Sequence, residues 1–305
     1  MATASAPALP RTLGPGVLAT LVVLCASWGL QQVGIKLAMA DVPPVTQMAI
    51  RSAGGAVLMA GFAVTRGVRF AERDGTLVPG LLLGLIFGGE FVLIYLGLSL
   101  TTASRSVLFL YTAPLFVALG ALVVLPGERL AGRQWAGLAL SFCGVVVAFG
   151  LPTEGMTART LLGDLACLAG GALWGTSTLV IRASRLRRAP FEKVALYQLV
   201  VSALMAGATA WAIGERTTAM PSATAVGWIG YQIVWVAFVT FLVWFRLVSR
   251  YPAGPLQAAT SMTPLFGVAF GVLILGEPMS PGFALAVALS VAGLALVSGA
   301  PGRRR

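Results

Sequence analysis

Apolar stretches of the length needed to cross a lipid bilayer as a helix limit the fold of this chain more than any other feature. A spanning helix needs about 20 mostly apolar residues. Short polar or Pro/Gly-containing segments separate ten such stretches, which cover residues 14–38, 45–65, 77–99, 103–125, 133–151, 161–183, 193–214, 224–248, 255–276 and 281–299. The sequence therefore predicts an all-α polytopic membrane protein with ten transmembrane helices.

The composition supports a lipid environment and argues against several classes of function. Only 10% of the residues are charged and the mean hydropathy is +0.90, whereas soluble domains carry roughly 25% charged residues. The net charge of +11 lies in connectors and tails instead of one folded basic face, which argues against a nucleic-acid partner. His is absent and the three Cys residues stand alone in apolar runs. We therefore expect no metal, no cofactor and no enzyme active site.

The placement of Lys and Arg residues predicts which ends of the helices face the cytoplasm. If the N-terminus is cytoplasmic, all but five of the 21 Lys and Arg residues fall inside, the exceptions being Lys36, Arg51, Arg105, Arg159 and Arg216. Cytoplasmic loops carry an excess of these residues. An even number of spans also returns the chain to the side on which it started. We therefore expect residues 1–13 and 300–305 to be cytoplasmic tails.

Two halves of the chain repeat one pattern of residues. ASWGLQQVGIK (26–36) returns as ALWGTSTLVIR (172–182), and TAPLF (112–116) returns as MTPLF (262–266). A Gly-Glu pair follows each member of the second match, as Gly127-Glu128 and Gly276-Glu277. The shared order of these matches predicts two copies of one five-helix unit, residues 14–151 and 161–299.

An odd number of helices in each unit means that the second unit enters the membrane from the opposite side. In such an inverted repeat the two halves can exchange conformations, so that a site between them opens first to one side and then to the other. The 5+5 inverted repeat therefore predicts a transporter that works by alternating access.

The chain resembles the drug/metabolite transporter superfamily in its EamA-type, ten-helix branch. The resemblance rests on the two Trp-Gly helices that end in Lys36 and Arg182, on Pro114 and Pro264 in equivalent spans, and on the Gly-Glu pairs that follow. The stretch GGEFVLIYLGLSLTTASRSVLFLYTAP (88–114) looks typical of bacterial members. The resemblance implies a metabolite exporter of the bacterial cytoplasmic (inner) membrane, with amino acids, aromatic ones among them, and amphipathic drugs as common substrates.

Glu90 is an ionisable residue deep within the third predicted span. Such a group inside a membrane costs roughly 2–3 kcal/mol or more and marks a functional site by default. The equivalent residue of the second half is Thr240, so symmetric packing alone does not demand a carboxylate. With His absent, Glu90 is the best candidate for substrate binding and proton coupling. A structural role stays open, in which Glu90 pairs with Arg51 or Arg105.

Trp28 and Trp174 occupy equivalent positions in the middle of their spans, too deep for the interfacial anchoring that membrane Trp residues usually provide. Four-residue spacing puts Gln32 on the face of Trp28 and Thr178 on the face of Trp174. An aromatic ring beside a hydrogen-bonding group suits a small amphipathic solute. We expect these four residues to line a substrate cavity. Close packing beside glycines and hydrogen bonding between helices are the alternatives.

Further residues are candidates for substrate binding or gating. Tyr111, Trp235 and Met262 complete the candidate substrate site. Proline removes a backbone donor and loosens a helix locally, so Pro114 and Pro264 are either hinges or tolerated kinks.

Lys36 and Arg182 end the two equivalent helices and are candidate gates, although long basic side chains at helix ends also reach toward the membrane surface without any such role. In the third span Gly80, Gly84 and Gly88 form overlapping GxxxG patterns, which predict close helix packing.

These features predict a secondary transporter that exports a small amphipathic metabolite, such as an amino acid, or a drug. The expected partners are that small molecule and the lipid bilayer, with protons as a candidate coupling ion; monomer and homodimer both stay open. An importer, or a lipid or nucleotide-sugar carrier of the same superfamily, is the main alternative. A membrane adaptor that transports nothing is a weaker one.

Overall fold

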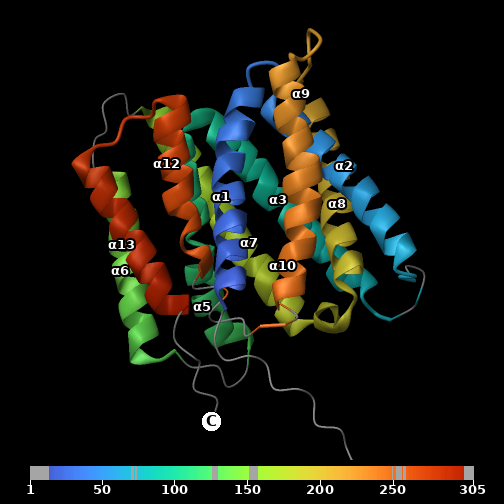
Figure 1. The fold of residues 1–305 in the computed structure, drawn as a ribbon, viewed down its shortest axis with the longest axis horizontal. Helices are drawn as coiled ribbons and strands as arrows, with labels where there is room; N and C mark the ends of the chain where they lie inside the picture. The colour runs from blue at the N-terminus through green and yellow to red at the C-terminus, as the bar shows by residue number, and fades with distance from the viewer. Residues whose placement is uncertain are drawn as a thin grey trace, which may run out of the picture.

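The computed structural model describes residues 14–69, 72, 74–125, 130–150, 157–248, 250–251, 256 and 259–298, and every regular element within them is a helix (Figure 1). The predicted tails 1–13 and 300–305 and the Gly127-Glu128 pair lie outside the described residues. The all-helical prediction is therefore confirmed for the described part of the chain.

Among the described residues, seven stretches are long and apolar enough to cross a membrane. They are α1 (Pro15–Ala38), α2 (Pro44–Thr65), α3 (Leu77–Leu100), α4 with α5 (Ala103–Leu110 and Ala113–Val124), α7 (Ala158–Ala183), α8 (Phe191–Ala212) and α9 with η2 and α10 (Ala223–Gly230, Tyr231–Thr240 and Phe241–Val248). The remaining helices are α6 (Gly132–Gly150), η1 (Arg185–Arg188), α12 (Thr263–Leu275) and α13 (Pro281–Ser298). Of these, α12 and α13 are apolar but shorter.

The predicted span over residues 103–125 agrees with Ala103–Val124, which is long and apolar enough to cross a membrane, but the helix in this stretch is broken after Leu110. Tyr111 and Thr112 form a turn, and α5 begins with Pro114 in its first turn. Proline fits there because the first backbone N–H groups of a helix have no partner within it. The same arrangement recurs at α12, where a turn at Ser261 and Met262 precedes Pro264. Each proline starts a helix instead of bending one.

The eighth predicted span runs without interruption from α9 to α10, but its middle is a π-helix, η2. π-Helical turns are rare and frequently occur at functional sites. The wider turn moves the side chains of Tyr231–Thr240 out of the register that an α-helix would give them. The sequence pattern holds no signal for this change.

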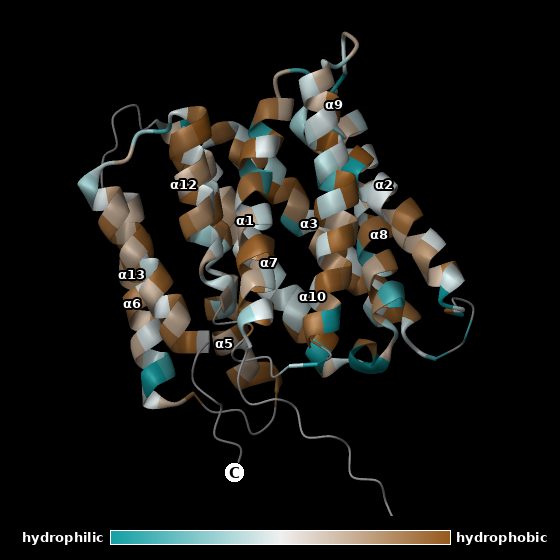
Figure 2. Cartoon of the chain, viewed as in Figure 1, coloured by the Kyte–Doolittle hydropathy of each residue, from teal (hydrophilic) through white to brown (hydrophobic). Residues whose placement is uncertain are grey.

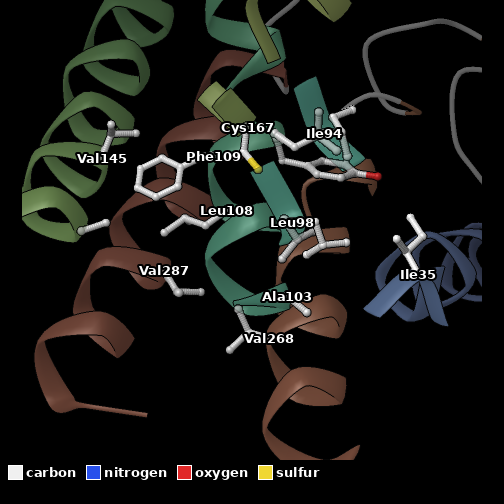
Figure 3. Packing of buried hydrophobic residues seen from close by; sticks show 14 of the residues in the cluster. Ile35, Ile94, Leu98, Ala103, Leu108, Phe109, Val145, Cys167, Val268 and Val287 are labelled. Atoms are coloured by element: carbon white, nitrogen blue, oxygen red, sulfur yellow. The ribbon is translucent and has the colours of Figure 1, made fainter. Parts of the chain in front are cut away.

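The largest apolar core joins helices from both halves of the chain. Figure 3 shows part of it, including Leu108 and Phe109 of α4, Val145 of α6 and Val287 of α13. The helices α6 and α13 lie side by side (Figure 1), and their backbones meet closely: a Cβ on Gly144 would lie 2.7 Å from the carbonyl oxygen of Ala286. Elements far apart in sequence therefore share one core.

Glycines also set the approach of α3 to two of its neighbours. A Cβ on Gly84 would lie 2.5 Å from the carbonyl oxygen of Tyr197 in α8, and Gly80 and Gly88 face α8 in the same way. On another face, a Cβ on Gly97 would lie 2.8 Å from the carbonyl oxygen of Gly163 in α7. Small residues let helix backbones approach this closely. The packing predicted from the GxxxG patterns of α3 is confirmed.

Polar contacts join connectors at each end of the helices. At the upper end in Figure 1, Glu215 accepts hydrogen bonds from the backbone N–H groups of Val45 and Thr46, and Asp41 accepts from Ser222. At the lower end, Lys193 donates to Asp74. Figure 2 shows many of the hydrophilic residues near the helix ends and in connectors, with hydrophobic residues along the helices between them.

Candidate functional site

Two opposite charges lie buried between α2 and α3. Arg51 is 1% exposed and Glu90 is 4% exposed, and the two attract each other electrostatically. Arg51 is held over the ring of Phe91, with its guanidinium carbon 4.3 Å from the ring centre. Nevertheless, Nε and Nη1 of Arg51 and Oε2 of Glu90 have no hydrogen-bond partner. Buried polar groups are nearly always satisfied, so this pair is the most unusual polar feature among the described residues.

A chain of buried side chains connects α3 to η2 and α2. The hydroxyl of Tyr95 donates to Oε1 of Gln232 at 2.5 Å, and Nε2 of Gln232 donates to Oε1 of Gln47 at 3.5 Å. Gln47 in turn donates to the backbone carbonyl oxygen of Val42 at 2.9 Å. Tyr95 also lies near Arg51, with which it interacts electrostatically. This network therefore borders the Arg51–Glu90 pair.

Aromatic side chains from both halves of the chain meet at the break between α4 and α5. The rings of Tyr111 and Trp174 contact each other edge to face, with centroids 5.2 Å apart. Tyr111 interacts electrostatically with Glu90, which brings the break close to the buried charges. Two of the predicted substrate residues, Tyr111 and Trp174, are thus in contact, and Tyr111 lies near Glu90.

Trp28 and Trp235 lie instead at the seam between α1 and η2. Nε1 of Trp28 donates to Oγ1 of Thr240 at 3.0 Å, and Nε1 of Trp235 donates to Oγ of Ser27 at 2.8 Å. The hydroxyl of Tyr231 donates to the carbonyl oxygen of Ser27 at 2.9 Å. Trp235 is 38% exposed. These hydrogen bonds join α1 to the π-helix.

The other predicted site residues lie at separate places. Oε1 of Gln32 accepts a hydrogen bond from Ser106 in α4 at 3.4 Å. Thr178 donates to the carbonyl oxygen of Trp174 in its own helix. Met262 is half-buried in the turn before α12. The side chains of Gln32 and Thr178 thus bond to groups other than the indole rings with which the spacing argument paired them, although each shares the helix of its tryptophan.

The two candidate gate residues differ in their surroundings. Lys36 is half-buried in the last turn of α1 and is attracted to Glu277. Arg182 is exposed in the last turn of α7. Glu277 itself accepts hydrogen bonds from the backbone N–H groups of Ala103 and Ser104 at the start of α4. The acidic residue of the second Gly-Glu pair therefore caps a helix of the first half.

Arg105 does not pair with Glu90, which corrects one of the structural alternatives considered for Glu90. It forms a buried ion pair with Asp164, with Nη2 and Oδ2 2.5 Å apart, and Nη2 also donates to the carbonyl oxygen of Ala148. Asp164 accepts a further hydrogen bond from Thr101. Sequence reasoning missed Asp164, although a carboxylate inside the predicted span 161–183 was the same signal that singled out Glu90.

Asp74 lies outside the membrane-spanning helices in the connector before α3. Hydrogen bonds from Lys193 and from the Thr76 side chain and backbone hold the pKa of Asp74 well below its usual range. Its contact with Lys193 ties the connector to the start of α8. This pair belongs to the scaffold and not to the buried charged site.

Long apolar helices that enclose charged groups without partners are characteristic of membrane transporters as a class, and the comparisons identify the family. Two segments, residues 15–150 and 161–299, match the model of the EamA-like transporter family. The chain belongs to this family, and it is a membrane transporter of the drug/metabolite superfamily.

Individual relatives are distant but span almost the full chain. A probable amino-acid metabolite efflux pump of Salmonella typhimurium is 27% identical over 299 residues, covering 92% of this chain and 93% of its own length. The uncharacterized transporter YoaV of Bacillus subtilis is 23% identical and covers 91% of this chain and 95% of its own length. A solved crystal structure matches with a TM-score of 0.65 at 23% identity, over 92% of this chain and 95% of that one, which supports the same fold.

Proposed function

We propose that this protein is a secondary transporter that exports a small amphipathic metabolite, such as an amino acid, or a drug across the bacterial inner membrane. The observation that carries the proposal is the buried pair of Arg51 and Glu90, in which Nε and Nη1 of Arg51 and Oε2 of Glu90 lack hydrogen-bond partners. Glu90 lies near Tyr111, which contacts Trp174. Amphipathic solutes present both charged and apolar groups, and this set of residues offers a partner for each.

Alternating access is the proposed mechanism, with ten spans arranged as two inverted five-helix units, 14–151 and 161–299. Arg51, Glu90 and Tyr111 come from the first unit and Trp174 from the second. A site that both units build would change its exposure when the units exchange conformations. The two breaks, before Pro114 and before Pro264, are the proposed hinges, since turns absorb backbone rotation more easily than helices do.

The direction and substrate class draw support from named relatives. Two relatives that span most of this chain are described as probable amino-acid metabolite efflux pumps, those of Escherichia coli (25% identical) and Salmonella typhimurium (27% identical). We extend the description to this chain as a proposal, and we propose that Glu90 couples efflux to proton entry. A carboxylate buried between helices can bind either a proton or a cationic group, which is the requirement for exchange between them.

Flux measurements in proteoliposomes test the proposal. Wild type, Glu90→Gln and the exposed control Glu72→Gln would be assayed with labelled aromatic, aliphatic and basic amino acids, with and without an imposed pH gradient. If Glu90 couples transport, the gradient drives accumulation in wild type and Glu72→Gln, whereas Glu90→Gln retains only downhill exchange. Equal, gradient-independent flux in all three proteins would disprove proton coupling and leave a passive carrier. No flux of any solute would contradict export itself.

A further inference from the structure

The Arg51–Glu90 pair differs from the other buried charges of the described residues because its atoms are not satisfied. Arg105 forms an ion pair with Asp164, and Lys193 forms one with Asp74. In contrast, Nε and Nη1 of Arg51 and Oε2 of Glu90 have no hydrogen-bond partner. The charged groups of Arg51 and Glu90 are close enough to attract each other and yet do not form a salt bridge.

The free-energy cost of burying two charged groups makes this arrangement informative. Taking two charged groups out of water costs several kcal/mol per ion unless they pair with each other or with another polar group. Direct contact would be the simplest way to lower that cost. Here the two groups are buried without direct contact, so donor atoms of Arg51 and an acceptor atom of Glu90 stay available. A third molecule that carries both an acceptor and a donor could bridge them.

Neighbouring aromatic rings restrain the guanidinium of Arg51, and α3 positions Glu90 beside it. The guanidinium of Arg51 lies 4.3 Å over the ring of Phe91, a contact that restrains its position. Phe91 directly follows Glu90 in α3, so one helix positions both charges. The ring of Phe91 also lies near that of Tyr95, at 6.4 Å between centroids. The ring contacts therefore restrain the position of Arg51, whose Nε and Nη1 have no hydrogen-bond partner.

A further aromatic residue, Tyr111, lies near Glu90. Tyr111 interacts with Glu90 and contacts Trp174 edge to face. Apolar rings at this position suit an apolar or aromatic group that extends from the charged end of a ligand. The other buried Arg of the described spans, Arg105, already forms an ion pair with Asp164. It is therefore not available to bind the carboxylate of a solute.

We infer that Arg51 and Glu90 form a receptor for a zwitterion, in which Arg51 binds a carboxylate, Glu90 binds an ammonium group, and the side chain of the solute lies toward Tyr111 and Trp174. The inference rests on the proposed function and narrows it. Arginine suits this role because its planar guanidinium binds carboxylates through two hydrogen bonds. A solute that lacks either charge would leave one of the two buried groups unsatisfied.

Three solutes with one carbon skeleton separate these contributions. Phenylalanine carries both charges, phenethylamine carries only the ammonium group, and 3-phenylpropionate carries only the carboxylate. Leucine, isoamylamine and 4-methylpentanoate repeat the series with an aliphatic side chain. Binding to the purified full-length protein would be measured by calorimetry, and flux separately in proteoliposomes. The variants are Arg51→Gln and Glu90→Gln, and the exposed Arg216→Gln is the matched control.

The expected result is a charge-specific pattern. Wild type and Arg216→Gln bind the zwitterion of a series more tightly than either singly charged analogue. Arg51→Gln weakens binding of the zwitterion about 10- to 100-fold and does not weaken binding of the amine. Glu90→Gln weakens the zwitterion similarly and does not weaken binding of the carboxylate. If Arg51→Gln does not fold, Arg51→Lys keeps the charge and is expected to keep the order of preference with weaker binding.

Several outcomes overturn the inference. Wild type that binds no zwitterion of either series, or that prefers a singly charged analogue, contradicts it. Folded Arg51→Gln or Glu90→Gln with the affinity of wild type also contradicts it, as does an Arg51→Lys variant with a reversed order of preference. Binding of zwitterions without flux would support the receptor and contradict the proposed export. Flux of other solutes without zwitterion binding would support the proposed export and contradict the receptor.

Discussion

At the scale of single residues, the charged side chains within the spans divide into two kinds. Arg105 and Asp164 satisfy each other and join α4 to α7. Arg51 and Glu90 do not satisfy each other. Since an unsatisfied buried charge lowers stability, the scaffold pair is expected to matter for folding and the unsatisfied pair for binding.

Arg105→Gln should destabilise the protein strongly. The change leaves the carboxylate of Asp164, which is 0% exposed, without its cation. Breaking a buried ion pair on one side costs about 3–5 kcal/mol. Thermal unfolding in detergent should show a large drop in the midpoint, and the double change Arg105→Met with Asp164→Leu should recover much of it. A double variant as unstable as the single one would contradict this explanation.

Asp74→Asn should lower stability in a pH-dependent way. The pKa of Asp74 is below its unfolded value of about 3.9, so its stabilising effect is present above that value and is lost as the pH falls through the lower, folded pKa. The difference in unfolding midpoint between wild type and variant should therefore be largest near neutral pH and shrink in strong acid. Glu72→Gln, which removes an exposed pair with Arg69, is the control and should have little effect.

At the scale of helices, close contacts and hydrogen-bonded seams have different roles. The backbones of α3 and α7 meet directly at Gly97 and Gly163, a contact that a moving interface could not easily change. The seam between α1 and η2 instead depends on hydrogen bonds from Trp28, Tyr231 and Trp235. Hydrogen bonds between side chains can be exchanged at modest cost, so we expect this seam to open more readily.

Gly97→Ala should force α3 and α7 apart. The new methyl group would lie 2.7 Å from the sulfur of Cys167 and 2.8 Å from the backbone of Gly163. Overpacking of this kind costs about 1–3 kcal/mol, so the unfolding midpoint should fall. Gly207→Ala is the matched control in α8, where an added Cβ meets nothing within 4 Å. There the better helix propensity of Ala should leave stability unchanged or raise it.

Thr240→Val and Ser27→Ala should loosen the seam between α1 and η2. Thr240→Val leaves the indole N–H of Trp28 without its acceptor, at a cost of about 1–3 kcal/mol. Hydrogen exchange followed by mass spectrometry should show faster exchange over residues 231–240 in both variants. Thr20→Val should leave this segment unchanged, because that hydroxyl donates to Gly16 within its own helix. Unchanged exchange in all three would mean that these bonds do not hold the seam.

At the scale of the whole molecule, the distribution of charge predicts the orientation in the membrane. The connectors that Glu215 and Asp41 join should lie outside, and the connector at Asp74 should lie inside. We expect alkaline phosphatase fused after Gly214 to be active, and green fluorescent protein fused after Arg305 to fluoresce. The opposite pattern would reverse the proposed direction of the chain.

The sequence by itself determined the all-helical class, the rough limits of most described helices and the family, and it singled out Glu90 as an ionisable residue inside a span. These are local properties: the length of an apolar run and the cost of a charge within it can be read one segment at a time. The same reasoning applied to residues 161–183 would have found Asp164. The family match over residues 15–150 and 161–299 agrees with the two-part reading of the sequence.

Only the tertiary structure decided which residues meet. It paired Arg105 with Asp164 and left Arg51 near Glu90, whose Oε2 has no hydrogen-bond partner. It also brought Tyr111 to Trp174 while Trp28 went to Thr240 in another seam. Partner choice depends on which faces of the helices pack together, and the sequence of one apolar helix does not specify this because nearly every face is apolar. Glycine contacts and helix breaks determine which faces pack together. They therefore also determine where the buried charges remain unsatisfied.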